Sequence, residues 1–247
     1  MTIGAMILAA GRGDRMRPLS DATPKPLLEA GGKPLIVWQI EALARAGLRD
    51  IVINAAHLAD HLVARLGDGG ALGVRLSWSL EPEALETAGG IATALPLLPP
   101  GPALIVSADV WSAFDYATLL PRAAAMAHDR TVPRVHLVMV PNPAYHPAGD
   151  FVLVDGPACS PGRIALDGGQ CLTFGNIGLY DTALFRELRR GAKLKLAPLL
   201  LDWIGRELVS GERYIGPWTN VGTPEDLARL NATLETPTGT PPAMIAR

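Results

Sequence analysis

The chain has few cysteines and few lysines. Its two cysteines, Cys159 and Cys171, are too few for a disulfide framework, and they do not stand at a metal-binding spacing. A reducing compartment is therefore expected. Most basic residues are arginines, so each of the four lysines is a candidate for a specific role; these are Lys25, Lys33, Lys193 and Lys195.

The chain also has little net charge and no long apolar runs. The formal net charge is −2 over 247 residues, so the chain has no basic field for a nucleic acid polymer and no acidic tail. No stretch approaches the roughly 18 uninterrupted apolar residues of a membrane helix, and the N-terminus has no charged segment before an apolar one. We therefore expect a cytoplasmic protein that does not bind membranes. Its 49% hydrophobic residues are enough for one large α/β domain.

An apolar run near the N-terminus, residues 6–10, ends abruptly at Gly11 and Gly13. This pattern is typical of a buried strand that leads into a phosphate-sized loop. Because glycine has no Cβ, the backbone N–H groups of such a loop can approach an anion closely. Four cations stand within 14 residues around the mouth of the loop: Arg12, Arg15, Arg17 and Lys25. The stretch suits a polyphosphate, although Gly-x-Gly alone is equally compatible with a turn that has a solvated basic rim.

Three better-known motifs are excluded. No Gly-Lys-Ser or Gly-Lys-Thr ending follows the loop, so it is not a Walker P-loop. Met16 stands where a dinucleotide-binding fingerprint requires its third glycine. His57 and His61 have a spacing that zinc accepts, but neither a third ligand nor an adjacent glutamate accompanies them, so we interpret them as surface histidines.

Apolar strands and helical patterns alternate through the first half of the chain. Strands are predicted at 51–55, 74–78 and 103–107, and helices at 33–46, 59–66 and 89–97. This alternation favours a parallel, doubly wound sheet, in which ligands lie beyond the carboxyl ends of the strands. The Gly11–Gly13 loop, Asn54 and Asp109 all fall at such ends, so we expect them to meet.

The second half is less regular. Strands are predicted at 135–140, 151–154, 163–166, 171–180 and 214–218, and helices at 181–190 and 197–211. Thr223 and Pro224 mark a further helix start, as N-cap and first helical residue. Residues 1–235 are expected to form one domain, because no linker divides them. The tail, residues 236–247, contains three prolines and is expected to be disordered.

The N-terminal stretch as a whole resembles the signature of the sugar nucleotidyltransferases, or NDP-sugar pyrophosphorylases. That signature reads L-A-A-G-x-G-x-R-x-x-P-L-T and then P-K-P-L; here it runs from Leu8 to Leu19, has Ser20 in place of threonine, and continues at residues 24–27. The resemblance covers nearly the whole domain and is greatest to the N-acetylmuramate-1-phosphate uridylyltransferases. It implies a Rossmann-like, doubly wound, mixed but mostly parallel sheet, with a small β-rich insertion that binds the sugar.

The resemblance also implies a reaction and its residues. UTP and N-acetylmuramate 1-phosphate would give UDP-N-acetylmuramate and pyrophosphate with the help of Mg²⁺, in peptidoglycan recycling. Catalytic roles are implied for Arg15, Lys25 and Asp109. Nucleotide binding is expected from residues of the loop, the strand ends and a second glycine-bearing element at 81–91, namely Ala10, Gly11, Arg12, Gly13, Lys25, Asn54, Gly89 and Ser107.

Two positions match the family's Mg²⁺ ligands, and one departs from the pattern. Asp109 ends a buried strand, where a carboxylate is costly unless it is paired or binds a cation. The second position lies in the family motif W-x-D-V-G-T-P, in which this chain has Asn220 instead of aspartate. An amide oxygen can coordinate Mg²⁺ but supplies no charge, so we expect weaker metal binding.

Four residues are candidates for the sugar-phosphate side: Asn142, Asp150, Asn176 and Lys195. Asn142, between two prolines, is by itself more often a turn residue, and the alternatives for Lys195 are to cover apolar surface with its stem or to cap a helix.

Two other functions remain open. The same chemistry on another pair of substrates, such as GTP and mannose 1-phosphate, is one of them. A weakly active protein that binds sugar nucleotides is the other, because of Asn220. A monomer or small homo-oligomer is expected.

Overall fold

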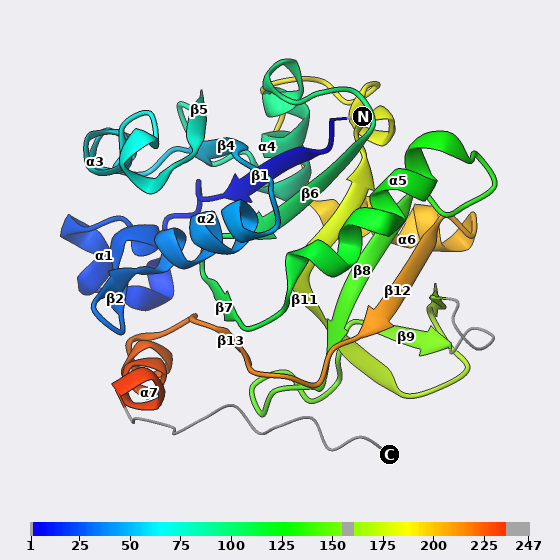
Figure 1. The fold of residues 1–247 in the computed structure, drawn as a ribbon. Helices are drawn as coiled ribbons and strands as arrows, with labels where there is room; N and C mark the ends of the chain where they lie inside the picture. Colours follow the sequence, from blue (N-terminus) through cyan, green and yellow to red (C-terminus); the bar gives the residue numbers. More distant parts are fainter. Residues whose placement is uncertain (1, 155–160, 236–247) are drawn as a thin grey trace.

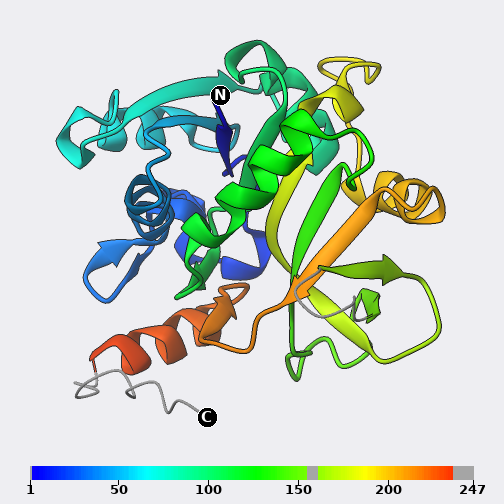
Figure 2. The same cartoon turned by 45° about the vertical axis from the view of Figure 1, so that its right-hand side comes forward.

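A nine-stranded mixed sheet forms the centre of the computed structural model, which describes residues 2–154 and 161–235 (Figures 1 and 2). In spatial order its strands are β5 (Arg75–Leu80), β4 (Asp50–Ala55), β1 (Gly4–Leu8), β6 (Pro102–Ser107), β11 (Cys171–Asp181), β8 (Val135–Val140), β12 (Val209–Arg213), β10 (Gly162–Ala165) and β9 (Phe151–Val154).

The first four strands of this order are parallel and in register at their carboxyl ends. Leu8, the last residue of β1, pairs with Asn54 on one side and with Ser107 on the other. Beyond β6 the sheet becomes mixed: β11 is antiparallel to β6 and β8, β12 is parallel to β8, and β9 and β10 form an antiparallel hairpin. The loops after β1, β4 and β6 therefore open at one edge.

Helices cover both faces of the sheet, and each face has its own core. On one face α2 (Leu35–Arg45), α3 (Ala59–Leu66) and α5 (Leu120–His128) pack on residues such as Ile7, Ile53 and Val106. On the other face α4 (Glu86–Ala94) and α6 (Leu196–Gly205) pack on Met6, Val52 and Ile105. These are neighbouring residues of the same strands, because successive side chains of a strand point to opposite faces.

A third, smaller core joins the end of the chain to its beginning. The C-terminal helix α7 (Pro224–Glu235) contributes Leu227 and Leu230, which pack with Met16 and Leu35. Just before α7, β13 (Trp218–Asn220) pairs antiparallel with β7 (Val110–Ser112), the strand that follows β6. In both views α7 and β13 lie on the side of β7 and of the N-terminal loop (Figures 1 and 2).

Short elements complete the described chain. They are a two-stranded ribbon, β2 (Glu29–Ala30) with β3 (Lys33–Pro34), one turn of α-helix, α1 (Leu19–Ala22), and the 3-10 helices η1 (Asp14–Met16), η2 (Lys25–Leu27), η3 (Gly70–Leu72), η4 (Leu95–Leu97), η5 (Tyr116–Leu119) and η6 (Thr182–Phe185). No helix within residues 2–154 and 161–235 is both long and apolar enough to cross a membrane.

The fold class is confirmed, but several predicted elements in the second half are wrong. The helix predicted at 181–190 is only the short η6. The helix predicted at 197–211 ends at Gly205, because Glu207 has a left-handed φ of 56° and Val209 begins the central strand β12. The strand predicted at 214–218 lies between two real ones, β12 and β13. Helix α5 was not predicted from the sequence, and the predicted tail lies outside the described residues.

The pair Arg134–Asp181 tests how the sheet is held at the start of β8. Its side chains are 17% and 9% exposed, and Nε of Arg134 donates to Oδ2 of Asp181 at 3.0 Å. Asp181→Ala leaves a nearly buried guanidinium without its partner, so we expect the free energy of unfolding to fall by about 3 kcal/mol or more. Asp202→Ala is the control, because its pair with Arg206 is 58% and 61% exposed and contributes about 1 kcal/mol at most. Urea unfolding of both variants measures the difference; equal losses would contradict this account.

Candidate active site

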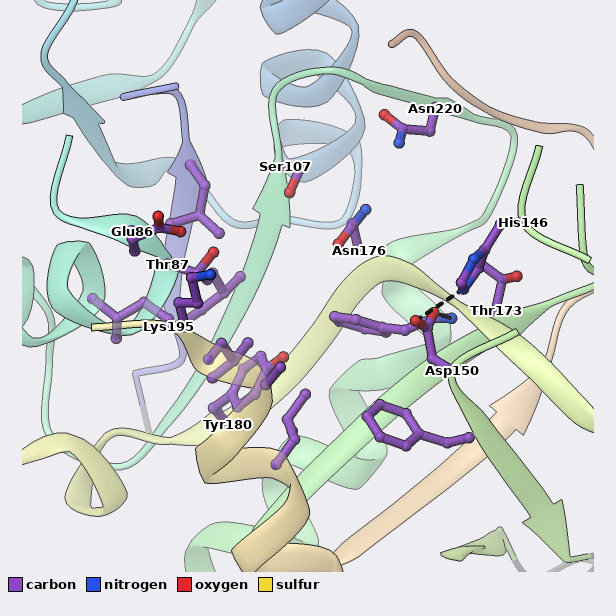
Figure 3. A pocket seen from close by; sticks show the side chains of 18 of the residues that line it. Glu86, Thr87, Ser107, His146, Asp150, Thr173, Asn176, Tyr180, Lys195 and Asn220 are labelled. Carbon is purple, nitrogen blue, oxygen red and sulfur yellow. Dashed lines mark hydrogen bonds and ion pairs between the residues drawn. The ribbon is translucent and has the colours of Figure 1, made fainter. Parts of the chain in front are cut away.

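Two adjoining cavities open at the carboxyl edge of the parallel strands. The first, here called the loop cavity, has a volume of about 730 Å³ and is lined by residues 8–15, Lys25, Asn54, Asp109 and Gly222, among others. The second, the β11 cavity, has a volume of about 490 Å³ and lies against β11 and the start of α6 (Figure 3). Leu8, Glu86, Thr87 and Ser107 line both cavities, so molecules bound in the two would touch.

The glycine loop is bent tightly by local contacts. Gly13 has a φ of 70°, and a Cβ at this position would lie 3.1 Å from Cβ of Lys25. The hydroxyl of Ser20 donates to the Gly13 carbonyl oxygen at 2.8 Å. Glycine is therefore required at 13 by backbone conformation and by space. At Gly11 a Cβ would meet nothing within 4 Å, so any need for glycine there must come from what enters the cavity.

Three of the four predicted cations line the loop cavity. They are Arg12, Arg15 and Lys25. Arg17 does not, which corrects the prediction that it joins the other three at the mouth of the loop. Its guanidinium instead lies 3.2 Å from Asp21 and 3.6 Å from Asp14, one helical turn away on either side.

An ion pair between a buried lysine and a partly exposed aspartate connects the loop with the end of β6. Nζ of Lys25 lies 2.5 Å from Oδ2 of Asp109, and Lys25 is only 8% exposed. A buried ammonium is costly unless it is paired, so the two residues hold each other at the wall of the cavity. Sequence analysis placed both at strand or loop ends and assigned both to catalysis, but it did not predict that they touch.

Asp109 and Asn220 are held side by side by the β7–β13 ribbon. Asn220 pairs with Val110, and the N–H of Val221 donates to the Asp109 carbonyl oxygen at 2.8 Å. Oδ1 of Asn220 is buried and has no hydrogen-bond partner among the residues that the structure describes. An unsatisfied buried carbonyl costs about 1–3 kcal/mol, so this oxygen fits a role as ligand to a cation or a substrate donor.

Tyr145 lies beside Asn220, and Gly222 follows Asn220 two positions along the chain. Burial raises the pKa of the Tyr145 phenol, and the Asn220 side chain beside it acts in the opposite direction. On the other side, Gly222 lies close to Arg15, because a Cβ at position 222 would be in ordinary contact with the guanidinium carbon at 3.5 Å. In residues 2–154 and 161–235, no cluster of three or more His, Cys, Asp or Glu could hold a metal ion. A divalent ion held at Asp109 and Asn220 would therefore need water or substrate oxygens to complete its shell.

Asn54 braces the glycine loop from the neighbouring strand. Its Oδ1 accepts the N–H of Ala9 at 2.9 Å, and its Nδ2 donates to Oε1 of Glu81 at 2.7 Å. The other carboxylate oxygen of Glu81 accepts the N–H of Leu85 at 3.0 Å. Burial raises the pKa of Glu81, and these two hydrogen bonds act against it. Asn54 also lines the loop cavity, so its predicted part in nucleotide binding stays a prediction.

Gly89 is not where the sequence analysis expected it. It lines neither cavity, its N–H donates to the Leu194 carbonyl oxygen at 3.1 Å, and a Cβ there would lie 2.1 Å from the carbonyl oxygen of Ala192. The close approach is thus to the chain's own backbone, and this geometry does not support contact with a base. From the same element, Glu86 and Thr87 reach both cavities instead.

Asn142 also has a different place from the one predicted. Its Nδ2 donates to the carbonyl oxygens of Pro147 and Cys171, both at 3.0 Å, and its Oδ1 accepts the hydroxyl of Thr173 at 2.9 Å. It braces the loop before Asp150 and does not line the β11 cavity. The alternative interpretation as a turn residue fits better.

The other three predicted sugar-side residues do line the β11 cavity: Asp150, Asn176 and Lys195. Asp150 is held by the N–H of Phe174 at 2.8 Å and by Nε2 of His146 at 3.1 Å (Figure 3). Asn176 has a left-handed φ of 56° where the pairing of β11 with β8 shifts, and its side chain points into the cavity (Figure 3).

Several lining residues were not assigned by sequence analysis. They are Glu83, Glu86, Thr87, Tyr145, His146, Thr173, Tyr180, Lys193 and Trp218. Lys193 had a signal, since the chain has only four lysines. Most of the others stand within a few residues of a predicted position, but nothing in the sequence tells which of them face inward.

Gly89→Ala tests the packing role of Gly89. The added methyl group would meet backbone at 192, so we expect the free energy of unfolding to fall by about 1–3 kcal/mol. Gly205→Ala is the control, because a Cβ at this helical position meets nothing within 4 Å and alanine favours helix by up to about 1 kcal/mol. Urea unfolding compares the two. A Gly89→Ala protein of wild-type stability that fails to bind nucleotide would show that Gly89 faces the base after all.

Comparison with known proteins shows the family of the chain. The family described as "Nucleotidyl transferase" matches residues 4–145. N-acetylmuramate alpha-1-phosphate uridylyltransferase of Neisseria meningitidis serogroup B is 45% identical over 220 residues, 89% of this chain and 93% of that protein. The protein of the same name from Caulobacter vibrioides is 38% identical over 161 residues, 62% of this chain and 65% of that protein.

Solved structures share the fold at low sequence identity. A Bacillus anthracis structure described as a glucose-1-phosphate thymidylyltransferase superposes with a TM-score of 0.79 at 21% identity, covering 95% of this chain and 96% of its own. HddC from Yersinia pseudotuberculosis superposes with a TM-score of 0.71 at 18% identity, covering 95% and 100%. The resemblance seen in the N-terminal signature is therefore confirmed over most of the chain, and the protein is an enzyme that belongs to the nucleotidyl transferase family.

Proposed function

We propose that the enzyme is a Mg²⁺-dependent uridylyltransferase that converts UTP and N-acetylmuramate 1-phosphate into UDP-N-acetylmuramate and pyrophosphate. The observation that carries the proposal is the pair of adjoining cavities. One is lined by a glycine loop and cations, and the other by polar side chains that a sugar could contact. The 45% identity to the Neisseria uridylyltransferase supports the choice of base and sugar. The reaction would serve peptidoglycan recycling in the cytoplasm.

The reaction needs no protein nucleophile. A phosphate oxygen of the sugar 1-phosphate attacks the α-phosphorus of the nucleotide in line, and the bond to the β-phosphate oxygen breaks to release pyrophosphate. Both substrates are polyanions, so the protein's task is to position them and offset their charge. Arg12 and Arg15, at the loop cavity, would bind the β- and γ-phosphates, and Lys25 would reach toward the α-phosphate where the two cavities meet.

Asp109 and Asn220 would hold Mg²⁺ at the same junction. The fit rests on the free Oδ1 of Asn220 and on the shared β7–β13 ribbon that places it next to Asp109. Mg²⁺ usually takes one or two carboxylates and completes its shell with water and substrate phosphates. When bound, it would supply positive charge to the reacting phosphates.

Pyrophosphate release tests the proposal. UTP, GTP and TTP are each combined with the 1-phosphates of N-acetylmuramate, N-acetylglucosamine, glucose and mannose, with Mg²⁺ and with EDTA. We expect the highest kcat/KM for UTP with N-acetylmuramate 1-phosphate, and loss of activity in EDTA. Preference for GTP with mannose 1-phosphate would favour the other substrate pair, whose guanylyltransferase from Mycobacterium tuberculosis is 34% identical over 118 residues. Tight binding of UDP-sugars without turnover would favour the binding protein.

Lys25→Ala tests the role of the buried lysine. Loss of one preorganised cation should lower kcat by roughly 10²–10³-fold. Lys33→Ala is the matched control, because Lys33 pairs with Glu41 at 2.6 Å and lines neither cavity. Thermal unfolding checks that each variant is folded. A Lys25→Ala enzyme with normal kcat and only a raised KM would show that Lys25 binds substrate without stabilising the transition state.

Asn220→Asp tests the proposed metal position. The additional carboxylate should lower the Mg²⁺ concentration for half-maximal activity by roughly tenfold, equivalent to about 1.4 kcal/mol. Asn231→Asp makes the same change in α7, where Oδ1 accepts the N–H of Gly31 at 2.8 Å and the residue lines neither cavity. Titration with MgCl₂ compares both with wild type. An unchanged Mg²⁺ requirement in Asn220→Asp would remove this residue from the metal site.

A further inference from the structure

The segment 192–195 is fixed rigidly against the start of α4. The N–H of Leu194 donates to the Leu85 carbonyl oxygen at 2.9 Å, and the Leu194 carbonyl oxygen accepts the N–H groups of Ala88 and Gly89 at 3.0 and 3.1 Å. The missing side chain of Gly89 lets the backbone come this close. The two lysines that flank Leu194 are therefore anchored by three backbone hydrogen bonds, although their own side chains are exposed.

The two lysines serve different cavities. Lys193 lines the loop cavity and Lys195 the β11 cavity, where it lies near Thr87 at the side away from Asn220 (Figure 3). Of the lysines and arginines that the structure describes, Lys195 is the one that lines the β11 cavity. The basic side chain that the described chain offers to this cavity thus lies on the side away from Asn220.

No acidic side chain in the described lining of the β11 cavity forms an ion pair with Lys195, so its amino group is available to a ligand. The titratable residues that line the β11 cavity with it are Glu86, Tyr145, His146, Asp150 and Tyr180. Asp150 is already bound by His146 and by the N–H of Phe174. No ion pair within 4.0 Å joins Lys195 to Glu86 or to any other acid in the described part of the chain. Apolar residues also line this cavity and are here called the apolar wall: Ile91, Leu196, Ala197 and Leu200, of which Leu196 and Ala197 directly follow Lys195 in the chain.

An amphipathic anion suits this corner. N-acetylmuramate differs from N-acetylglucosamine by one group, a lactyl ether on O3 that carries a methyl and a carboxylate. We infer that Lys195 binds this carboxylate and that the apolar wall receives the methyl group, so that Lys195 selects the muramate sugar. The inference rests on the proposed function. With the carboxylate at Lys195, beside Thr87, the phosphate would lie toward Asn220, on the other side of the cavity (Figure 3).

The two sugars form a matched pair of ligands that tests the inference. For wild type, Lys195→Met, Lys195→Arg and Lys193→Met, kcat/KM is measured with UTP and either sugar 1-phosphate, and the affinity of each sugar 1-phosphate is measured by calorimetry. A charge-assisted hydrogen bond predicts that Lys195→Met lowers the preference for the muramate sugar by about tenfold to a hundredfold. Activity on N-acetylglucosamine 1-phosphate should change little, Lys195→Arg should restore much of the preference, and Lys193→Met should leave the preference intact.

The outcomes separate this inference from the proposed function. An equal loss on both sugars in Lys195→Met would place Lys195 at the phosphate and overturn the inference while uridylyl transfer stands. An unchanged preference would overturn it as well. If wild type turns over neither sugar, the proposed function fails, and the calorimetric affinities alone decide: the inference then requires tighter binding of the muramate sugar that Lys195→Met abolishes, and equal affinities contradict it.

Discussion

The ion pair between Lys25 and Asp109 is the contact on which the arrangement of the site depends. It joins the segment after the glycine loop to the end of β6, and it places a nearly buried ammonium beside a carboxylate at 2.5 Å. The Asp109 carboxylate, which is 32% exposed, offsets the cost of burying the Lys25 ammonium. A nucleotide phosphate that approaches Lys25, or a cation that approaches Asp109, would compete with this pair. The pair therefore holds both charged groups in place before any substrate binds, which is the preorganisation that charge-based catalysis requires.

The C-terminal part of the chain completes the site from the other side. The β7–β13 ribbon sets Asn220 next to Asp109, and α7 packs on Met16 and Leu35 from the first segment. Capping contacts hold the turn between β13 and α7, because Oδ2 of Asp226 accepts the N–H groups of Gly222 and Thr223 at 3.0 and 2.9 Å. Gly222 in turn lies close to the Arg15 guanidinium. Residues about 200 positions apart in the sequence thus share one edge of the sheet.

Local sequence patterns predicted the first half of the fold and most of the loop cavity, because the ends of parallel strands meet by topology alone. The rest depended on contacts between distant segments. Gly89 is required by the backbone at Ala192, and Asn142 is occupied by Pro147, Cys171 and Thr173. Residues 206–218 were misassigned because the helix ends at a left-handed residue and the next strand fills a place in the sheet that no local pattern reveals. The orphaned Oδ1 of Asn220 is likewise a fact of three-dimensional packing.

The central claim is that Asp109 couples nucleotide binding to a divalent cation at the junction of the two cavities. Calorimetric titration of UTP into wild type and Asp109→Asn, each with Mg²⁺ and with EDTA, tests it most directly, since binding is measured without turnover. We predict that Mg²⁺ tightens UTP binding to wild type by roughly tenfold or more, and that this gain disappears in a folded Asp109→Asn protein. An equal Mg²⁺ effect in both proteins would contradict the account and move the cation away from Asp109.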